Sequence, residues 1–387
     1  MKNNIPQGYK ATALGIIPQE WEIFDFDEIV EKSKERYIPN PDTHLYCIEL
    51  EHLSQGEGTL IGYTDSAEQK STKNRFQNGD VLFGKLRPYL QKYWLATFDG
   101  VCSTEIWVFH AKPNICLKEY LLRIISSYNF IQKANVSSGS KMPRAEWDYV
   151  SKIPVLVPPL AEQRKIAEVL GVWDEAIEKQ ARLIEKLALR KRALMQRLLS
   201  AKLRLPGFSS PWQKVKLGDI CNITTGKIDA NAMESNGIYP FFTCAKEIYR
   251  INKYAFDTEA LLISGNGEYV GYIHYCKGKF NAYQRTYVLD KFKANIFYVK
   301  HALQYHLPKR ILQTKSNSNT PYIVIGTLQD MIISEPSIKE QTAIAEVLTA
   351  ADSEIELAKE KLDRLRRQKR GLMQQLLTGK KRVKYGN

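Results

Sequence analysis

Residues 162–170 read Glu-Gln-Arg-Lys-Ile-Ala-Glu-Val-Leu, and residues 340–348 read Glu-Gln-Thr-Ala-Ile-Ala-Glu-Val-Leu. The offset from 162 to 340 is 178 residues. It holds without a gap to Lys-Arg-Ala-Leu-Met-Gln-Arg-Leu-Leu at 191–199 and Lys-Arg-Gly-Leu-Met-Gln-Gln-Leu-Leu at 369–377. An internal repeat of this length indicates the architecture more directly than any local motif. The sequence therefore predicts one chain that carries two related modules.

Each module opens with a tryptophan, Trp21 in the first copy and Trp212 in the second. The two tryptophans are 191 residues apart, which exceeds the 178-residue offset by 13, so the first variable region is 13 residues longer than the second. Between the tryptophan and the Glu-Gln motif, the copies barely resemble each other. We interpret this pattern as a shared scaffold that flanks two divergent inserts.

The inserts have the patterns of a mixed α+β fold. Short apolar runs bounded by turn residues predict buried strands, and runs rich in aromatic and β-branched residues predict further strands. The expected strands are 80–83, 105–109, 260–263 and 285–289, and the expected helices are 120–127 and 297–306. Each insert then reaches a polar loop, at 137–144 in the first copy and 315–321 in the second.

The repeated segments predict long helices. Apolar residues follow a 4-3-4-3 spacing from Ile166 to Leu198 and from Ile344 to Leu376, which is the seam of a coiled coil. Each helix either runs unbroken for about 40 residues, roughly 60 Å, or breaks near Gly171 and its counterpart. Lys191 and Lys369 occupy matching seam positions. Each either fixes the register of the pair or extends its ammonium to water.

Bulk properties restrict the class of protein. The net charge is +14, which favours a polyanionic partner, most commonly nucleic acid. No apolar run is long enough to span a bilayer, and the start of the chain lacks an apolar signal segment, so we expect a cytoplasmic protein with no membrane partner. The six cysteines and six histidines show no metal-ligand spacing, and we expect no metal, cofactor or catalytic residue on this chain.

Base-reading side chains should be Arg, Lys, Asn, Gln or Ser on loops or short elements, because these groups match the donors and acceptors of base edges. The candidates in the first insert are Lys85, Arg87, Ser140, Lys141 and Arg144. The candidates in the second insert are Asn266, Asn281, Gln284, Arg285, Asn317 and Asn319.

Two other patterns are better explained by ordinary structure or by chance than by a functional site. The glycine-rich stretch 264–271 resembles a nucleotide loop but continues into a strand-like segment, so it has no helix N-terminus to hold a phosphate, and a hairpin turn is the better interpretation. Asp42, Glu68 and Lys70 form a loose nuclease-like set. Such dispersed matches are common by chance.

The arrangement resembles the specificity subunit of type I restriction-modification systems. The resemblance is carried by Pro-Pro-Leu-Ala-Glu-Gln at 158–163, Pro-Ser-Ile-Lys-Glu-Gln at 336–341, the Leu-Met-Gln motifs at 194–196 and 372–374, and the two opening tryptophans. Together these motifs span nearly the whole chain. The first copy departs slightly from the pattern at Ser-Ala-Lys 200–202, where the second copy has Thr-Gly-Lys, and this leaves the end of the first helix open.

The resemblance implies an α+β fold with two target-recognition domains, and two long helices forming an antiparallel coiled coil with pseudo-twofold symmetry. The implied domains are recognition domain 1 (1–157), a central helical spacer (158–204), recognition domain 2 (205–335) and a C-terminal helical spacer (336–387). Each recognition domain would read one half of a split site on double-stranded DNA, and the helices would set the gap.

The resemblance also implies a non-catalytic subunit. Two methyltransferase subunits would dock on the helices and restriction subunits would join this core. S-adenosylmethionine, Mg and ATP would belong to those partners. Apolar residues off the seam are candidates for the partner interface, with burial against the neighbouring insert as the alternative: Leu183, Leu189, Met195, Leu199, Met373 and Leu377. Two other hypotheses are a nuclease using Asp42, Glu68 and Lys70, and a coiled-coil scaffold that does not bind DNA.

Overall fold

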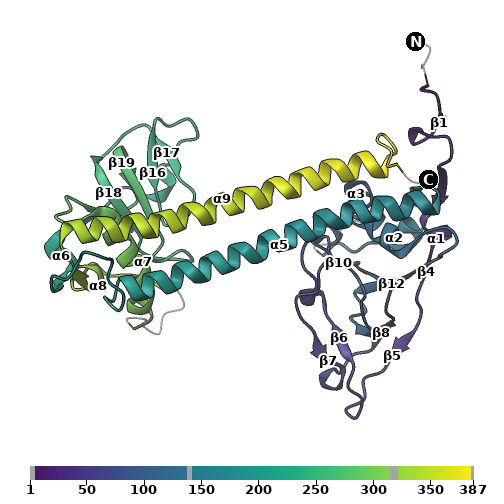
Figure 1. Ribbon diagram of the computed structural model, residues 1–387, viewed down its shortest axis with the longest axis horizontal. Helices are drawn as coiled ribbons and strands as arrows, with labels where there is room; N and C mark the ends of the chain where they lie inside the picture. Colours follow the sequence, from purple (N-terminus) through teal and green to yellow (C-terminus); the bar gives the residue numbers. More distant parts are fainter. Residues whose placement is uncertain (1–4, 137–141, 314–320, 385–387) are drawn as a thin grey trace. The chain divides into compact units, whose positions relative to one another are not determined.

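The computed structural model describes residues 5–136, 142–313 and 321–384. The chain forms two compact units, one of residues 1–180 with 361–387 and the other of residues 181–360. Both long helices, α5 (Leu160–Leu198) and α9 (Ile338–Leu377), contribute to both units. Figure 1 shows these helices in teal and yellow. The predicted domain boundaries separate the helices from the inserts, whereas the compact units each include part of both helices.

Both repeated segments form unbroken helices, of 39 and 40 residues, which correspond to about 60 Å each. The alternative with a break near Gly171 is therefore wrong. The Ser337 hydroxyl accepts a hydrogen bond from the Glu340 backbone N–H at 3.4 Å, as expected for an N-cap. Pro159 precedes the first residue of α5, and its carbonyl accepts the first helical hydrogen bond from the Gln163 N–H.

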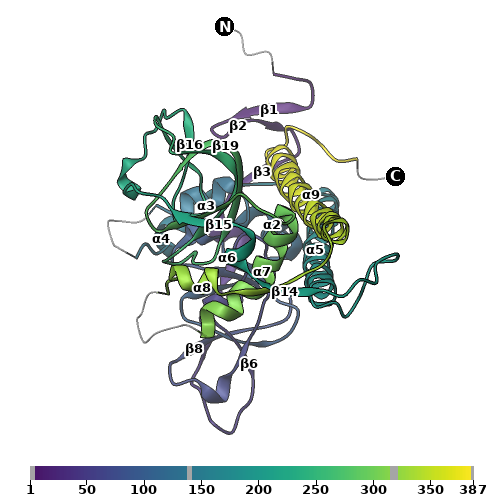
Figure 2. The same ribbon diagram turned by 90° about the vertical axis from the view of Figure 1, so that its left-hand side faces the viewer.

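Within each unit, segments of α5 and α9 run antiparallel. In the first unit, Glu162 and Asp174 of α5 contact Arg382 and Lys369 respectively, so one residue number rises as its partner's falls. In the second unit, Leu187 of α5 packs with Ile355 and Ala358 of α9, and Lys191 pairs with Asp352. Figure 2 looks along these segments. Since Ile166, Leu170, Ile344 and Leu348 are also buried, the apolar seam was correctly predicted.

The two seam lysines form ion pairs. Lys191 contacts Asp352 and Lys369 contacts Asp174, and the lysine side chains are only 14% and 13% exposed. Their ammonium groups therefore meet a carboxylate of the opposite helix instead of open water. This geometry supports the prediction that these lysines fix register.

The first unit is built on two sheets. A four-stranded sheet has the order β10-β9-β12-β4, and a five-stranded sheet has the order β5-β8-β11-β6-β7. The strands are β4 (Val30–Lys32), β5 (Arg36–Tyr37), β6 (Tyr46–Ile48), β7 (Thr64–Asp65), β8 (Lys73–Phe76), β9 (Val81–Gly84), β10 (Tyr93–Leu95), β11 (Gly100–Cys102) and β12 (Ile106–Ala111). Two pairs, β1 (Tyr9–Thr12) with β2 (Gly15–Pro18) and β3 (Glu22–Asp25) with β13 (Pro154–Val157), complete its strands. Its short helices are α1 (Phe26–Ile29), α2 (Lys118–Ile125), α3 (Tyr128–Ala134), α4 (Trp147–Val150), η1 (Leu50–His52), η2 (Ser66–Glu68) and η3 (Pro88–Leu90).

The second unit differs from the first in having one six-stranded sheet, of order β15-β20-β18-β19-β16-β17. Its strands are β15 (Asn222–Thr225), β16 (Tyr239–Phe242), β17 (Tyr249–Ile251), β18 (Phe256–Ser264), β19 (Ile273–Ala282) and β20 (Thr286–Asp290), with a separate pair of β14 (Gln213–Lys216) and β21 (Ile332–Glu335). Its helices are α6 (Leu217–Ile220), η4 (Ala230–Ala232), α7 (Ile296–Gln313) and α8 (Ile325–Gln329). The hairpin predicted at 264–271 is confirmed, because it joins the antiparallel strands β18 and β19.

Strand burial explains the short apolar runs of both inserts. Val81 and Phe83 of β9 belong to the core that packs on the helices, whereas Leu82 belongs to a second core on the opposite face of the sheet. In β18, Leu261 and Leu262 divide in the same way. Because successive side chains of a strand point to opposite faces, a strand covered on both faces is apolar at every position.

Candidate nucleic-acid interface

A buried glutamate ties the scaffold of each unit together. In the first unit, the Glu162 carboxylate accepts a hydrogen bond from Trp21 Nε1 at 2.9 Å and two from Arg382, at 2.6 and 2.9 Å. In the second unit, Glu340 accepts from Trp212 Nε1 at 3.0 Å and from Arg204 at 2.6 and 2.9 Å. The two sets correspond at the 178-residue offset for the glutamates and the arginines. This cluster explains why the tryptophan and the Glu-Gln motif recur together.

The glutamine of each motif fixes the insert on the helix. Gln163 accepts a hydrogen bond from the Leu117 N–H, which precedes α2, and Gln341 accepts one from the Asn295 N–H, which precedes α7; both distances are 2.8 Å. Both side chains also donate to the carbonyl of a proline five residues earlier, at 2.8 Å. The start of α5 is thereby bonded to the start of α2 in the first unit, and the start of α9 is bonded to the start of α7 in the second.

On this scaffold, three loops of the first unit meet at one end of β9 and β12. The Lys85 N–H donates to the Glu105 carbonyl at 2.9 Å, and the Lys85 carbonyl accepts from the Ala145 N–H at 2.9 Å. The Arg87 N–H donates to Pro143 at 2.8 Å. The Arg144 guanidinium contacts the Glu105 carboxylate at 3.1 Å and remains 47% exposed. Backbone hydrogen bonds thus hold Lys85, Arg87 and Arg144 together.

The second unit builds the same junction from different side chains. The Gly265 N–H donates to the Arg285 carbonyl at 2.9 Å, and the Ile323 N–H donates to the Gly265 carbonyl at 2.7 Å. The Gly267 N–H donates to Pro321 at 3.2 Å. A Cβ on Gly265 would lie 2.3 Å from the Arg285 carbonyl oxygen, so only glycine allows this approach.

These loops of the second unit enclose a pocket of about 340 Å³. Its lining includes Gln284, Arg285 and Tyr322, and the Tyr287 hydroxyl donates to the Ile323 carbonyl at 2.8 Å. Burial raises the pKa of Tyr287, so this phenol stays protonated as a hydrogen-bond donor. The pocket presents amide, guanidinium and phenol groups, which can read base edges.

Corresponding backbone conformations underline the equivalence of the two junctions. Arg87 has φ 51° and Gly267 has φ 80°, both in the left-handed region. Each N–H bonds a proline carbonyl, Pro143 or Pro321, and these prolines are 178 residues apart. Glycine adopts this conformation without strain, whereas arginine does so at a cost. Strain held at one exposed arginine is typical of a functional position.

The predicted base-reading residues lie in different environments. Lys85, Arg87 and Arg144 meet at one junction, and Asn266, Gln284 and Arg285 meet at the other. Asn281 is 5% exposed; its amide donates to the Lys253 carbonyl and its oxygen accepts from the Ala282 N–H. We therefore withdraw Asn281, because its side chain is committed inside the fold. Ser140, Lys141, Asn317 and Asn319 lie outside the described residues.

Sequence reasoning missed several residues of these sites. Tyr322 is 46% exposed in the second junction and corresponds to Arg144 at the 178-residue offset. Arg204 and Arg382 also correspond at that offset, just beyond the two helices. Continuing the repeat beyond the helix ends and back into the inserts would have identified all three.

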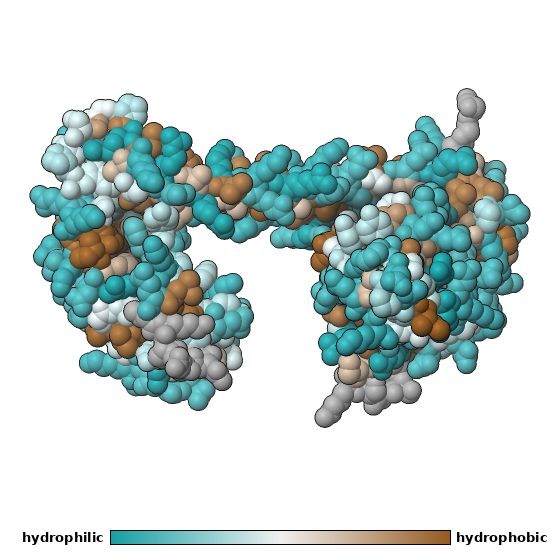
Figure 3. Space-filling view, turned by 90° about the horizontal axis from the view of Figure 1, so that it is seen from below, coloured by the Kyte–Doolittle hydropathy of each residue, from teal (hydrophilic) through white to brown (hydrophobic). Residues whose placement is uncertain are grey.

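The predicted partner interface is corrected in part. Met195 and Leu199 are buried in the core of the second unit, and Met373 is buried in the core of the first, where Leu377 also packs. Those four side chains fill cores because the insert packs against the helix end. Leu183 and Leu189 are 44% and 65% exposed. Figure 3 shows isolated hydrophobic residues on a largely hydrophilic helix surface.

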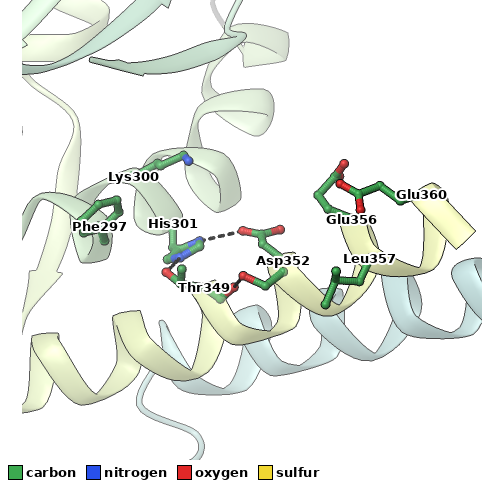
Figure 4. Close-up of a pocket in the computed structure, with 9 residues that line it drawn as sticks. Phe297, Lys300, His301, Thr349, Asp352, Glu356, Leu357 and Glu360 are labelled. Atoms are coloured by element: carbon green, nitrogen blue, oxygen red, sulfur yellow. Dashed lines mark hydrogen bonds and ion pairs between the residues drawn. The ribbon is translucent and has the colours of Figure 1, made fainter. Parts of the chain in front are cut away.

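A groove of about 410 Å³ lies between α7 and α9 of the second unit. Figure 4 shows His301 directed from α7 toward Thr349 and Asp352 of α9. His301 Nε2 lies 3.1 Å from the Thr349 hydroxyl, and Nδ1 lies 3.9 Å from the Asp352 carboxylate. Arg123 occupies the corresponding position in the first unit and contacts Asp174. The two units therefore differ in one buried cation.

Among the described residues, no three His, Cys, Asp or Glu side chains gather in a way that could hold a metal ion. Asp42 lies in an exposed turn, and Glu68 ends the short helix η2. None of the helices in the described ranges combines the length and apolar character needed to cross a membrane.

Comparison with known proteins identifies the class. The family described as "Type I restriction modification DNA specificity domain" matches residues 18–188 and 209–367. The chain therefore belongs to the type I restriction-modification DNA specificity family, and its role is DNA recognition. The two matched regions correspond to the two related modules.

Individual relatives agree with this assignment. The EcoDI specificity subunit of Escherichia coli is 41% identical over 154 residues, which cover 40% of this chain and 34% of that protein. The putative MjaX specificity subunit of Methanocaldococcus jannaschii is 26% identical over 98% of this chain and 97% of its own length. The chain thus matches a third of the first relative and nearly all of the second.

Solved structures share the fold. A chain from a study of complex assembly and conformational transition of the type I restriction-modification system has a TM-score of 0.62 at 21% identity, and covers 94% of this chain and 99% of that one. The S subunit from M. genitalium has a TM-score of 0.61 at 16% identity, and covers 97% of both chains.

Proposed function

We propose that each unit reads one half of a split DNA sequence through its three-loop junction. The observation that supports this proposal is that the junctions of the two units share one backbone arrangement but carry different side chains. Lys85, Arg87 and Arg144 would read one half, and Asn266, Gln284 and Arg285 would read the other. Bidentate contacts from arginine and amide side chains distinguish bases in the major groove. Different side chains at matching positions would therefore give the two halves different sequences.

The paired helices would set the gap between the two half-sites. Unbroken helices of 39 and 40 residues, joined by antiparallel contacts in each unit, suit a spacer of fixed length. The seam ion pairs Lys191–Asp352 and Lys369–Asp174 would keep the helices in one register. Slippage by a turn would change the gap, so register would be part of specificity.

The chain would act without catalysis of its own. Two methyltransferase subunits would dock on it, restriction subunits would join them, and S-adenosylmethionine, Mg and ATP would be bound by these partners. The exposed Leu183 and Leu189 are the remaining sequence-predicted candidates for a methyltransferase contact. The assembly would work in the cytoplasm.

Sequencing methylated sites in cells that express this chain with its methyltransferase tests the proposal. We expect a motif of two short specified halves around an unspecified gap. A continuous motif, or methylation without a motif, would refute it. Inserting seven residues, one heptad, at matching points in both helices should lengthen the gap and leave both halves unchanged. An unaltered gap would exclude the spacer role.

A further inference from the structure

A strip of cations borders the three-loop junction of the first unit. Lys32 ends β4, Lys34 follows it, and Arg36 begins β5. Within the described residues, no carboxylate lies within ion-pair distance of these three side chains or of Lys85, the loop lysine beside them. Lys34 and Arg36 are exposed. Unpaired like charges repel, so folding alone gives no reason to gather them.

Contacts within the fold connect this strip to the junction. Arg36 Nη1 donates to the Asn74 side-chain oxygen at 2.5 Å, and Asn74 Nδ2 donates to the Ile106 carbonyl at 2.8 Å. Ile106 follows Glu105, whose carbonyl accepts from the Lys85 N–H. The strip therefore continues the edge on which we place base recognition.

Lys32 is held in a defined position by two aromatic rings. Its ammonium lies 4.4 Å from the ring centroid of Trp147 and 5.7 Å from that of Trp107. Partial burial lowers the pKa of Lys32; nearby Asp148 opposes the shift, while Lys85, Lys34 and Arg36 add to it. Cation–π contact orients this charge at the surface without neutralising it.

The second unit lacks this strip. Lys32 pairs with Phe109 across the sheet, and Ile223 pairs with the corresponding Leu289, so Ile223 occupies the place of Lys32. The 191-residue offset between the opening tryptophans gives the same match. It places Thr225 opposite Lys34 and Lys227 opposite Arg36. Of the three positions that carry a cation in the first unit, only the third carries one in the second unit.

We propose that Lys32, Lys34 and Arg36 form a phosphate-binding strip for the DNA backbone, and that the first unit grips its half-site with more phosphate contacts than the second. This inference rests on the proposed function, because the strip adjoins the base-reading loops. Phosphate contacts position a protein on DNA and add affinity that does not depend on sequence. The second unit would depend more on base contacts for its share of binding.

Salt titration of DNA binding tests the strip. The full chain is measured by fluorescence anisotropy against duplexes of unrelated sequence, and the slope of log affinity against log salt is compared between variants. Each lost phosphate contact lowers the slope by about 0.9. We expect Lys34→Gln with Arg36→Gln to reduce the slope by about 2. Lys32→Arg, which keeps the charge, should retain the slope, and Thr225→Lys in the second unit should increase it by about 1.

The control removes the same charge elsewhere in the first unit. Lys112 and Lys118 are exposed and follow the other end of β12, so Lys112→Gln with Lys118→Gln should leave the slope unchanged. An unchanged slope for the strip variant, with Lys85→Ala and Arg87→Ala weakening binding to a duplex that carries the recognised sequence, would overturn the strip and leave the proposed function standing. Absence of duplex binding by the unaltered chain would overturn both.

Discussion

Arg382 binds Glu162 across 220 positions of sequence, with Nε 2.6 Å from Oε1 and Nη2 2.9 Å from Oε2. The residue at the end of one repeat thereby completes the scaffold at the start of the other. Glu162 is fully buried, and Trp21 supplies its further donor. Arg204 and Glu340 make the same contact in the second unit. Each unit thus depends on residues from both copies of the repeat.

Removing this arginine should destabilise its unit. Arg382→Ala leaves a buried carboxylate without its cation, which costs about 3 kcal/mol. Arg204→Ala should cost a similar amount in the second unit. Chemical denaturation followed by circular dichroism measures both. Arg370→Ala, at an exposed position of α9, is the control and should change stability by less than about 0.5 kcal/mol. Equal effects of all three changes would contradict the structural role.

Arg87→Gly should separate stability from DNA binding. Arg87 has φ 51° and ψ 65°, so glycine relieves strain and should stabilise the fold by about 1 kcal/mol. The same change removes a proposed base-reading group and should weaken binding to the cognate site. Gln91→Gly is the matched control, because Gln91 also has φ 51° but is not a proposed reader. It should stabilise without loss of binding; loss of binding in both variants would argue against a specific role for Arg87.

Reverse substitutions at the two corresponding helix ends should have opposite effects on stability. Ala201 has φ 58° and the corresponding Gly379 has φ 68°. Ala201→Gly should raise the free energy of unfolding by about 1 kcal/mol, because glycine adopts this conformation freely. Gly379→Ala should lower it by more, since the new Cβ would lie 2.4 Å from Pro18 Cδ. Thermal denaturation of both variants checks the signs; a stabilising Gly379→Ala would show that the end of α9 packs differently.

His301 should make the second unit sensitive to acid. Burial, then the nearby Lys191, lowers the pKa of His301 to about 4. The unfolded chain gains a proton near pH 6.5, and the folded chain gains it only near pH 4. Its contribution to stability is therefore complete above pH 6.5 and declines as pH falls toward 4, by at most about 3 kcal/mol.

Denaturant titration at several pH values measures this decline. The groups around the ring are Gln304, Thr349, Asp352, Lys191 and Lys300. His301→Gln should flatten the profile between pH 6.5 and 4. His44→Gln, at an exposed position in the first unit, should not, because the hydrogen bond to Asp65 raises the pKa of His44 and its effect on stability lies above pH 6.5. An unchanged profile for His301→Gln would assign the acid sensitivity to other groups.

The repeat predicted the large features of the fold because helix period and apolar spacing are local properties. It gave both long helices and the seam, including the two seam lysines. The core strands were found because they are covered on both faces. Contacts that join distant segments were not accessible from local patterns. The off-seam Met195, Leu199 and Met373 looked like an interface because the sequence could not show the insert that covers them.

The candidate site was predicted as a set of residue types more than as a geometry. Lys85, Arg87 and Arg144 were named as loop residues of suitable type, but that they meet at one junction is visible only in the structure. Asn281 satisfies its amide inside the sheet, which no spacing rule shows. Tyr322 was missed because the search favoured cations and amides over aromatic donors. Comparing the two junctions position by position identifies residues such as Tyr322 that no single motif indicates.

The most direct test of two independent reading units is an exchange of the first one. Residues 1–157 are replaced by the corresponding region of another specificity subunit, the chimera is expressed with its methyltransferase, and methylated sites are sequenced. Our account predicts that one half of the motif changes, while the other half and the gap stay the same. A chimera that folds and changes both halves would contradict it.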